Sequence, residues 1–364
     1  MSDNRLNVAA KLQHPRFQSS VARVASGEQL SGPLVVDLDP TSFCDLDCPE
    51  CISGDLLRAG RFPRERLIRI VQELIDLKVA AVVLIGGGEP LAHPATSDVI
   101  SRLHEAGVAV GVVTNGTMIR RHFSALSQKT HWVRVSVDAA SAETYSFFRP
   151  SRGSRDVFSE VISNVRELTS RSRGDVGFSF VLFSREQKDG RIQSNVHEIF
   201  AAAELARDLG CRYFELKASV RTDHHIEPQS DEILNEVEKQ LCNAEKLVTQ
   251  NFAIVLSSTL KVLRSRGRLD QPKSYDTCRV AKLRMLLTPT GSFVCSYHRG
   301  NQRMRTGDVQ QSPVQKAWLS PGPAVPSRDC PFHCARHEMN LQLEQLQPQG
   351  AFDHSDRSAT DLFL

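Results

Sequence analysis

The sequence predicts an α/β protein in which six strand–helix units form an open, partial (β/α)6 barrel, followed by a small C-terminal module. Short apolar runs alternate with amphipathic stretches between residues 34 and 217, which is the rhythm of a parallel sheet. Six units are fewer than a closed eight-fold barrel needs, so the barrel is expected to be open, with its chemistry at the carboxyl ends of the strands. From about residue 271 this rhythm ends, and Cys, Gly, Pro and Arg become more frequent.

The predicted elements follow one another in a regular order. The expected strands are 34–38, 80–85, 108–113, 132–137, 177–183 and 213–217. The expected helices are 64–77, 95–106, 155–170, 194–209 and 230–248. The predicted domains are an arm at 1–33, the barrel at 34–228, a linking helical segment at 229–270, the small module at 271–340 and a polar tail at 341–364.

Composition and charge narrow the class of protein. The chain has 364 residues, of which 40% are hydrophobic and 24% charged, as in an ordinary globular protein. Its net charge is only +3 and its basic residues are scattered, which predicts no nucleic-acid partner. No run approaches the roughly twenty apolar residues that span a bilayer, and the polar start lacks a signal peptide's apolar stretch. We therefore expect a soluble, cytoplasmic protein without a membrane partner, whose nine cysteines are metal ligands or buried side chains rather than disulfides.

Three cysteines follow the first predicted strand. Cys44, Cys48 and Cys51 have the spacing CxxxCxxC. On a loop, this spacing lets three thiolates bind one face of a [4Fe-4S] cluster and leaves one iron without a protein ligand. The alternatives are a zinc knuckle, which would need a fourth Cys or His nearby, and a chance pattern.

This motif resembles the signature of the radical S-adenosylmethionine (SAM) superfamily, and further family motifs occur in order at the strand ends over about residues 34–217. Gly86-Gly87-Gly88-Glu89-Pro90 is similar to the GGEP element of that family. The resemblance implies that Gly87 and Gly88 let the backbone approach the methionyl part of SAM, and that Glu89 meets its ammonium group. Thr114-Asn115-Gly116 and Ser136-Val137-Asp138 are similar to family positions near the nucleoside or the substrate, although a turn and a helix cap are the alternatives. The implied SAM-binding residues are Gly87, Gly88, Glu89, Asn115, Ser136 and Asp138.

Four more cysteines lie in the C-terminal module. Cys278 precedes a predicted β-hairpin and Cys295 lies on its outgoing strand, whereas Cys330 and Cys334 form a close pair. Four thiolates saturate a [4Fe-4S] cluster, although a zinc site with four cysteine ligands is an alternative. The module, including 307–318, resembles the single-cluster relative of the SPASM extension, often called a twitch domain. That resemblance implies one auxiliary [4Fe-4S] cluster, and two clusters in all.

Several other residues are weaker candidates. Cys211 begins the sixth strand at the structural end of the barrel, and Cys242 is expected to be a small buried side chain in a helix. Neither is well placed to quench a substrate radical, as radical epimerases do. Lys217 and Arg221 lie at or beyond the carboxyl end of the sixth strand, where they could meet a carboxylate or phosphate or could be solvated charges. Three residues flank the auxiliary cysteines and could face a substrate: Tyr275, His298 and Arg299.

The resemblance implies an enzyme that cleaves SAM reductively, with an electron from an external donor such as flavodoxin or ferredoxin. The resulting 5′-deoxyadenosyl radical would remove a hydrogen atom from a small-molecule or peptide substrate. Because a fully liganded auxiliary cluster can accept an electron but cannot bind substrate, we expect a dehydrogenase-like oxidoreductase. By analogy with a single-auxiliary-cluster dehydrogenase that acts on an amino-cyclitol, the first expected substrate is a sugar-like or cyclitol-like metabolite.

Two alternatives remain. The first is modification of a ribosomal peptide by epimerisation or cross-linking. The arm of 33 residues is too short for a peptide-recognition domain, so this alternative would require a separate recognition protein. The second is a non-catalytic zinc or iron-sulfur binding protein. The sequence does not identify a catalytic acid or base.

Overall fold

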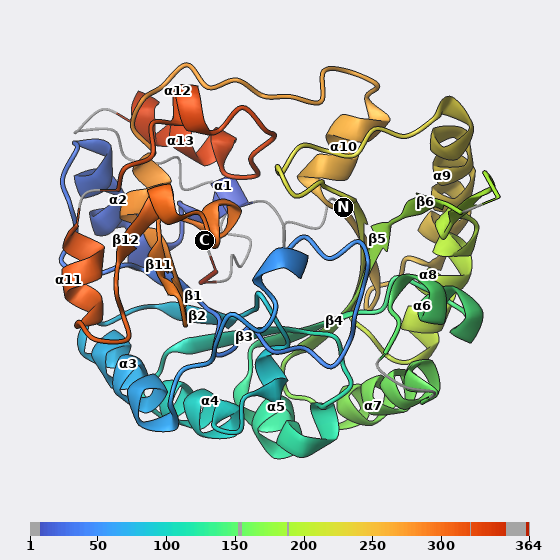
Figure 1. Ribbon diagram of the computed structural model, residues 1–364, viewed down its shortest axis with the longest axis horizontal. Helices are drawn as coiled ribbons and strands as arrows, with labels where there is room; N and C mark the ends of the chain where they lie inside the picture. The colour runs from blue at the N-terminus through green and yellow to red at the C-terminus, as the bar shows by residue number, and fades with distance from the viewer. Residues whose placement is uncertain (1–7, 152–154, 188, 321, 347–361, 364) are drawn as a thin grey trace. The chain divides into compact units, whose positions relative to one another are not determined.

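The computed structural model describes residues 8–151, 155–187, 189–320, 322–346 and 362–363 (Figure 1). Residues 1–7 of the predicted arm and most of the predicted tail at 341–364 lie outside these ranges. The chain divides into two compact units built from interleaved segments. The first contains Met1–Phe43, Leu56–Gly111 and Gln271–Leu364, and the second contains Cys44–Asp55 and Val112–Asp270. The predicted domain boundaries remain predictions.

In the first unit, the strands follow the order β12-β11-β10-β1-β2. Strand β1 (Val35–Leu38) lies between β2 (Ala81–Leu84) and β10 (Arg284–Thr288) and is parallel to both. Strand β10 forms the predicted antiparallel hairpin with β11 (Gly291–Phe293), and β12 (Arg305–Gly307) pairs with β11. All four residues of β1 are buried, as expected for a strand with a neighbour on each edge. A strand from the C-terminal part of the chain is therefore hydrogen-bonded to the first strand of the barrel.

Amphipathic helices cover this part of the sheet. Helices α3 (Arg64–Asp76) and α4 (Thr96–Glu105) lie side by side in Figure 1 and carry the connections that follow β1 and β2. The buried apolar residues of α3 recur with helical spacing, at Leu67, Ile70, Val71 and Leu74. In α11 (Val314–Leu319), the indole Nε1 of Trp318 donates a hydrogen bond of 2.7 Å to the carbonyl of Leu30. The other described α-helices of the first unit are α1 (Val8–Lys11), α2 (Gln18–Ala25), α12 (Pro326–Asp329) and α13 (His337–Gln345).

In the second unit, four parallel strands follow the order β4-β5-β8-β9. Their bounds are Trp132–Ser136, Asp175–Leu182, Tyr213–Ala218 and Ala253–Leu256. A separate antiparallel hairpin consists of β6 (Ser184–Glu186) and β7 (Ile192–Ser194). The helices are α5 (Phe123–Lys129), α6 (Ala142–Phe148), α7 (Val157–Arg171), α8 (Ile199–Asp208), α9 (Asp231–Ala244) and α10 (Ser258–Arg264). Strand β3 (Ala109–Thr114) contains the boundary between the two units.

The predicted α/β class with a parallel sheet is confirmed, and each of the six predicted strands is present within two residues of its expected limits. Helices α5 and α6 were not predicted. The segment 229–270, expected to be helical, also contains β9, whose four residues are too short a run to be distinguished by periodicity. None of the described helices combines the length and apolar character that a membrane crossing requires.

Candidate functional site

The loop that carries the first three cysteines belongs to the second unit. The side-chain amide of Asn115, at the end of β3, donates to Asp45 Oδ1 at 2.9 Å and contacts the Sγ atom of Cys44 at 3.8 Å. The amide oxygen of Asn115 accepts from the backbone N–H of Thr117 at 3.0 Å. Asn115 therefore forms the turn that its sequence suggested and also contacts the cysteine loop.

Two further contacts anchor this loop. The backbone N–H of Asp47 donates to the carbonyl of Pro150 at 2.8 Å. Glu50, which lies between two of the cysteines, forms an ion pair of 3.1 Å with Arg185. The guanidinium of Arg185 in turn stacks over the ring of Phe147 at 3.9 Å from its centroid. The loop is thus held at positions between its cysteines.

Burial raises the pKa of Cys48 to about 11, and the Arg149 guanidinium opposes this shift. The neighbouring thiol of Cys51 raises the pKa further. A thiol with so high a pKa ionises near neutral pH only when a nearby positive charge stabilises the thiolate, as a bound metal does. Three soft donors on one loop fit an iron-sulfur cluster, whose positive charge would stabilise the Cys48 thiolate.

Asp138 follows β4 and has an unusual backbone conformation, with φ of +62°. One carboxylate oxygen accepts from the backbone N–H of Val181 at 2.7 Å, and the other forms an ion pair with Arg149. Since Arg149 also acts on Cys48, Asp138 holds a buried cation beside the first cysteine loop. Ser136, the last residue of β4, is half-buried.

The glycine turn after β2 belongs to the first unit and is closely packed. A Cβ atom on Gly88 would lie 2.4 Å from the carbonyl oxygen of Phe43, and one on Gly86 would lie 2.2 Å from the carbonyl oxygen of Gly88. Glu89 is 2% exposed. Its Oε1 atom accepts from the backbone N–H of Leu91 at 3.0 Å, and its own N–H donates to Phe43 at 2.8 Å. The turn therefore requires glycine and fixes the direction of the Glu89 carboxylate.

A buried ion pair supports the same turn. Asp39 accepts from the backbone N–H of Gly87 at 3.0 Å and from Arg299 Nε at 2.7 Å through the same oxygen, Oδ2. Burial raises the pKa of Asp39, while Arg299 and the Gly87 N–H act in the opposite direction. Arg299 comes from the cysteine-rich module, so the module contributes to the environment of the glycine turn.

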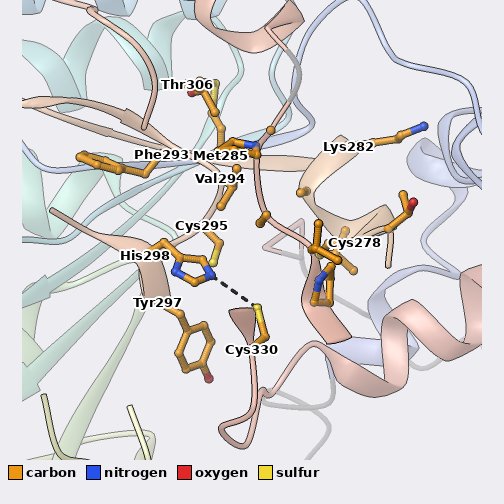
Figure 2. Close-up of a pocket in the computed structure, with 18 of the residues that line it drawn as sticks. Cys278, Lys282, Met285, Phe293, Val294, Cys295, Tyr297, His298, Thr306 and Cys330 are labelled. Atoms are coloured by element: carbon orange, nitrogen blue, oxygen red, sulfur yellow. Dashed lines mark hydrogen bonds between the residues drawn. The ribbon is translucent and has the colours of Figure 1, made fainter. Parts of the chain in front are cut away.

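The four remaining motif cysteines line one cavity of about 430 Å³ in the first unit. Figure 2 shows Cys278, Cys295 and Cys330 reaching this cavity from three separate segments. Cys334 also lines it. The Nε2 atom of His298 lies 3.4 Å from the Sγ atom of Cys330, as the dashed line in Figure 2 marks. Segments far apart in the sequence thus bring all four predicted auxiliary cysteines to one cavity.

Burial raises the pKa of all four of these thiols, to about 12 for Cys330. Four soft donors that need a positive charge to ionise fit an iron-sulfur cluster chemically. Over the described ranges, no three His, Cys, Asp or Glu side chains are gathered tightly enough to hold one metal ion. A cubane differs in this respect, because each of its thiolates binds a different iron atom.

Lys217 is part of a buried charge cluster on the parallel strands of the second unit. Glu215 on β8 pairs with Arg134 on β4 at 3.0 Å and with Lys217 at 3.7 Å. The Lys217 side chain is 23% exposed and burial lowers its pKa, so it is not the solvated charge that the sequence allowed. Arg221 is that kind of charge, because it is exposed and pairs with Asp223 at 2.8 Å.

The isolated cysteines differ from each other. Cys211 is buried just before β8, and burial raises its pKa to about 12, which keeps the thiol neutral. Cys242 is exposed, so the expectation that it is buried was wrong. The helical pattern of α9 was read correctly, but the position of Cys242 around that helix was not. The sequence also gave no role to Asp37, Asp39, Arg149 or Arg336, because their partners are distant in the chain.

Comparison with known proteins places these features in a family context. Residues 38–193 match the Radical SAM superfamily. The AdoMet-dependent heme synthase of Methanosarcina barkeri is 25% identical over 207 residues, which cover 56% of this chain and 55% of the synthase. The mycofactocin maturase MftC of Mycobacterium tuberculosis is 24% identical over 298 residues, which cover 79% of this chain and 71% of the maturase. The chain therefore spans just over half the length of the first of these relatives.

A solved structure resembles most of this fold. The crystal structure of Streptococcus suis SuiB bound to the precursor peptide SuiA has a TM-score of 0.60 and 16% sequence identity. The match covers 83% of this chain and 68% of SuiB. This likeness confirms the predicted partial-barrel fold.

Proposed function

We propose that this chain is a radical SAM enzyme that cleaves SAM reductively and modifies a peptide substrate by radical chemistry. The family match over residues 38–193 includes the three-cysteine loop, and this loop is the observation that carries the proposal. The cofactors of the superfamily enzymes that it resembles are SAM, a [4Fe-4S] cluster and, in the relatives with a C-terminal extension, auxiliary clusters. The four-cysteine cavity supports the same assignment here.

The relatives support a peptide over the other substrates. The mycofactocin maturase aligns with 79% of this chain, which extends well beyond the family domain. SuiB, whose fold is similar, binds a precursor peptide. The heme synthase aligns over a shorter part, 56% of the chain, and so supports the shared chemistry rather than a shared substrate. The first expectation from sequence, oxidation of a sugar-like or cyclitol-like metabolite, has no support among these relatives.

We assign separate roles to the cysteines of the first loop and to the residues of the glycine turn. Cys44, Cys48 and Cys51 would hold the cluster that reduces SAM, and Glu89 would accept a hydrogen bond from the SAM ammonium group. When bound, the cofactors supply one-electron cleavage of SAM, removal of a hydrogen atom from the substrate and acceptance of one electron from the substrate radical. The glycine turn keeps the backbone accessible, and Asn115 orients the cysteine loop through Asp45.

The described thiols favour oxidation over epimerisation. Epimerisation needs a thiol that returns a hydrogen atom to the substrate radical. Cys211 is buried before the start of β8, and Cys242 lies exposed on α9. Four cysteines at one cavity can saturate a cluster, which then serves as an electron acceptor. We therefore propose an oxidative change such as a cross-link, in which the peptide loses a hydrogen atom, an electron and a proton.

The test combines metal analysis with product analysis. Protein reconstituted without oxygen is expected to hold about eight irons per chain, since two cubanes need four each. With SAM and a strong reductant it should form 5′-deoxyadenosine, and the Cys44→Ala, Cys48→Ala, Cys51→Ala triple variant should not. A short peptide encoded beside the gene should lose hydrogen mass in the reaction.

Each outcome discriminates between functions. Zinc without iron, together with intact SAM, would favour a non-catalytic metal-binding protein. Iron and SAM cleavage without any change in the peptide would remove the peptide assignment. Deuterium uptake from heavy water into an otherwise unchanged peptide would indicate epimerisation instead of oxidation.

A further inference from the structure

Each of the four sulfurs at the auxiliary cavity has a polar or charged partner from the chain. Asn340 Nδ2 lies 3.6 Å from the Cys278 sulfur, and His298 Nε2 lies 3.4 Å from the Cys330 sulfur. The Cys334 sulfur accepts a hydrogen bond from the backbone N–H of Arg336, and the Cys295 sulfur accepts hydrogen bonds from the backbone N–H groups of Tyr297 and His298. The cationic side chains of Arg336 and Lys273 line the same cavity as these sulfurs.

The position of Arg336 is fixed by its surroundings. It follows Cys334 by two residues, lines the same cavity, and its side chain is only 13% exposed. Its Nη2 atom lies 3.5 Å from Asp37 Oδ2 on β1.

Asp37 is shared between two arginines. Its carboxylate accepts from Arg284 Nε at 3.1 Å as well as facing Arg336, and it is 2% exposed. One buried carboxylate therefore balances two buried guanidinium groups, which leaves one positive charge in excess beside the cysteines. Lys273 donates to the backbone carbonyl of Phe332 at 2.9 Å, and among the described contacts no carboxylate ion pair restrains its charge as Asp37 restrains that of Arg336.

We propose that Arg336 raises the reduction potential of the auxiliary cluster, and that Asp37 limits this effect by neutralising part of its charge. The inference rests on the proposed function for the existence of that cluster. A [4Fe-4S] cluster with four thiolates becomes more negative by one charge when it takes up one electron. A fixed cation nearby stabilises the reduced form, and the low dielectric of a buried site strengthens the effect. A higher potential makes the cluster a better acceptor for an electron from a substrate radical.

The two partners of this ion pair have opposite expected effects, which separates the proposal from a purely structural role. Loss of the Arg336 charge should lower the potential. Loss of the Asp37 charge should raise it, because both arginines would then act on the cluster without compensation. Simple disruption of the cavity would move both variants in the same direction.

The experiment uses the full chain with Cys44, Cys48 and Cys51 changed to Ala, so that only the auxiliary cluster is present. About four irons per chain must be found before any potential is compared. The midpoint potential is then measured by a redox titration followed by electron paramagnetic resonance. The variants are Arg336→Gln, Arg336→Lys and Asp37→Asn. Arg328→Gln is the matched control, because Arg328 lies two residues before Cys330 but is 63% exposed and pairs with Asp329.

We expect a lower midpoint for Arg336→Gln, a midpoint near the parent for Arg336→Lys and Arg328→Gln, and a higher one for Asp37→Asn. An Arg336→Gln midpoint equal to that of the parent, or shifts of the same sign in Arg336→Gln and Asp37→Asn, would overturn the proposal. If Asp37→Asn does not fold, the difference between Arg336→Gln and Arg336→Lys decides. Absence of iron in the parent would overturn the auxiliary-cluster assignment itself, whereas a negative peptide assay would leave this measurement intact.

Discussion

Arg299 donates hydrogen bonds to both carboxylate oxygens of Asp39, from Nε at 2.7 Å and from Nη2 at 3.2 Å. The Asp39 side chain is 2% exposed and also accepts from the backbone N–H of Gly87. One buried carboxylate thus connects an arginine of the cysteine-rich module with the turn that precedes Glu89. Because bidentate contacts between charged groups restrict both partners, this pair should control the geometry of the turn.

The Arg299→Gln variant should therefore lose both stability and SAM affinity. It leaves Asp39 buried without its counter-charge, which we expect to cost about 3–5 kcal/mol in the free energy of unfolding. Urea denaturation measures this loss. SAM affinity, measured by calorimetry at a temperature where the variant is folded, should also fall.

The Asp39→Asn, Arg299→Gln double variant is the informative control. It removes both charges, so it should be more stable than Arg299→Gln alone, since an unpaired buried charge costs more than a missing pair. Arg303→Gln, an exposed change in the same module, should leave both quantities unaltered. Unchanged SAM binding in Arg299→Gln would show that the turn does not depend on this ion pair.

Two adjacent glycines should tolerate alanine very differently. A Cβ atom on Gly88 would lie 2.4 Å from backbone atoms of Ser42 and Phe43, whereas one on Gly87 would be 3.4 Å from the flexible Arg299 side chain. Gly88→Ala should destabilise the metal-free protein by about 3 kcal/mol, and Gly87→Ala by less than about 1 kcal/mol. Thermal unfolding of the two variants side by side tests this, and similar losses would contradict the packing described for the turn.

Glu89→Gln should weaken SAM binding while leaving the local structure intact. Glutamine keeps an oxygen that can accept from the Leu91 N–H, so only the negative charge is lost. A charge-assisted hydrogen bond contributes about 1.5–3 kcal/mol, so affinity should fall by roughly tenfold or more. Anaerobic titration with SAM measures the change, with the exposed Glu65→Gln as the control and iron content as the check on folding. Equal affinity would show that Glu89 does not contact the ammonium group.

Replacing Cys330 and Cys334 with Ala should separate SAM cleavage from product formation. The first cysteine loop lies in the other compact unit and should keep its cluster, so 5′-deoxyadenosine should still form. Iron should fall by about half, since one of two cubanes is lost. Oxidised peptide should disappear, because the substrate radical has lost its electron acceptor. Cys242→Ala removes an exposed thiol and serves as the control. Normal peptide turnover in the double variant would mean that the auxiliary cysteines are structural.

The sequence predicted the features that depend on local pattern. Apolar period and turn residues located the six parallel strands and the β10–β11 hairpin, because these signals lie within a few neighbouring residues. The cysteine spacings separated the three-thiol loop from the four-thiol set in the same way. The prediction that four cysteines bind one cluster also implied that distant cysteines lie together. Cys278 and Cys334 do line one cavity, although more than fifty residues separate them in the chain.

Features that depend on distant partners were not predictable in the same way. The parallel pairing of β10 with β1 has no local signal, because any apolar strand can fill a sheet edge. The roles of Asp37 and Asp39 were equally hidden, since their arginine partners come from the far end of the sequence. From the sequence, Lys217 could be a solvated charge or could pair with an anionic group. The structure shows that it belongs to a charge cluster with Glu215 on β8 and Arg134 on β4.

The pairing of β1 with β10 has a practical consequence for dividing the protein. A chain that stops before residue 271 would leave β1 as an open edge, with its main-chain groups on that side available to other molecules. Asp37 and Asp39 would lose the guanidinium groups that neutralise them. We expect such a fragment to aggregate, and the C-terminal segment added in trans to restore solubility only if it supplies the missing strand.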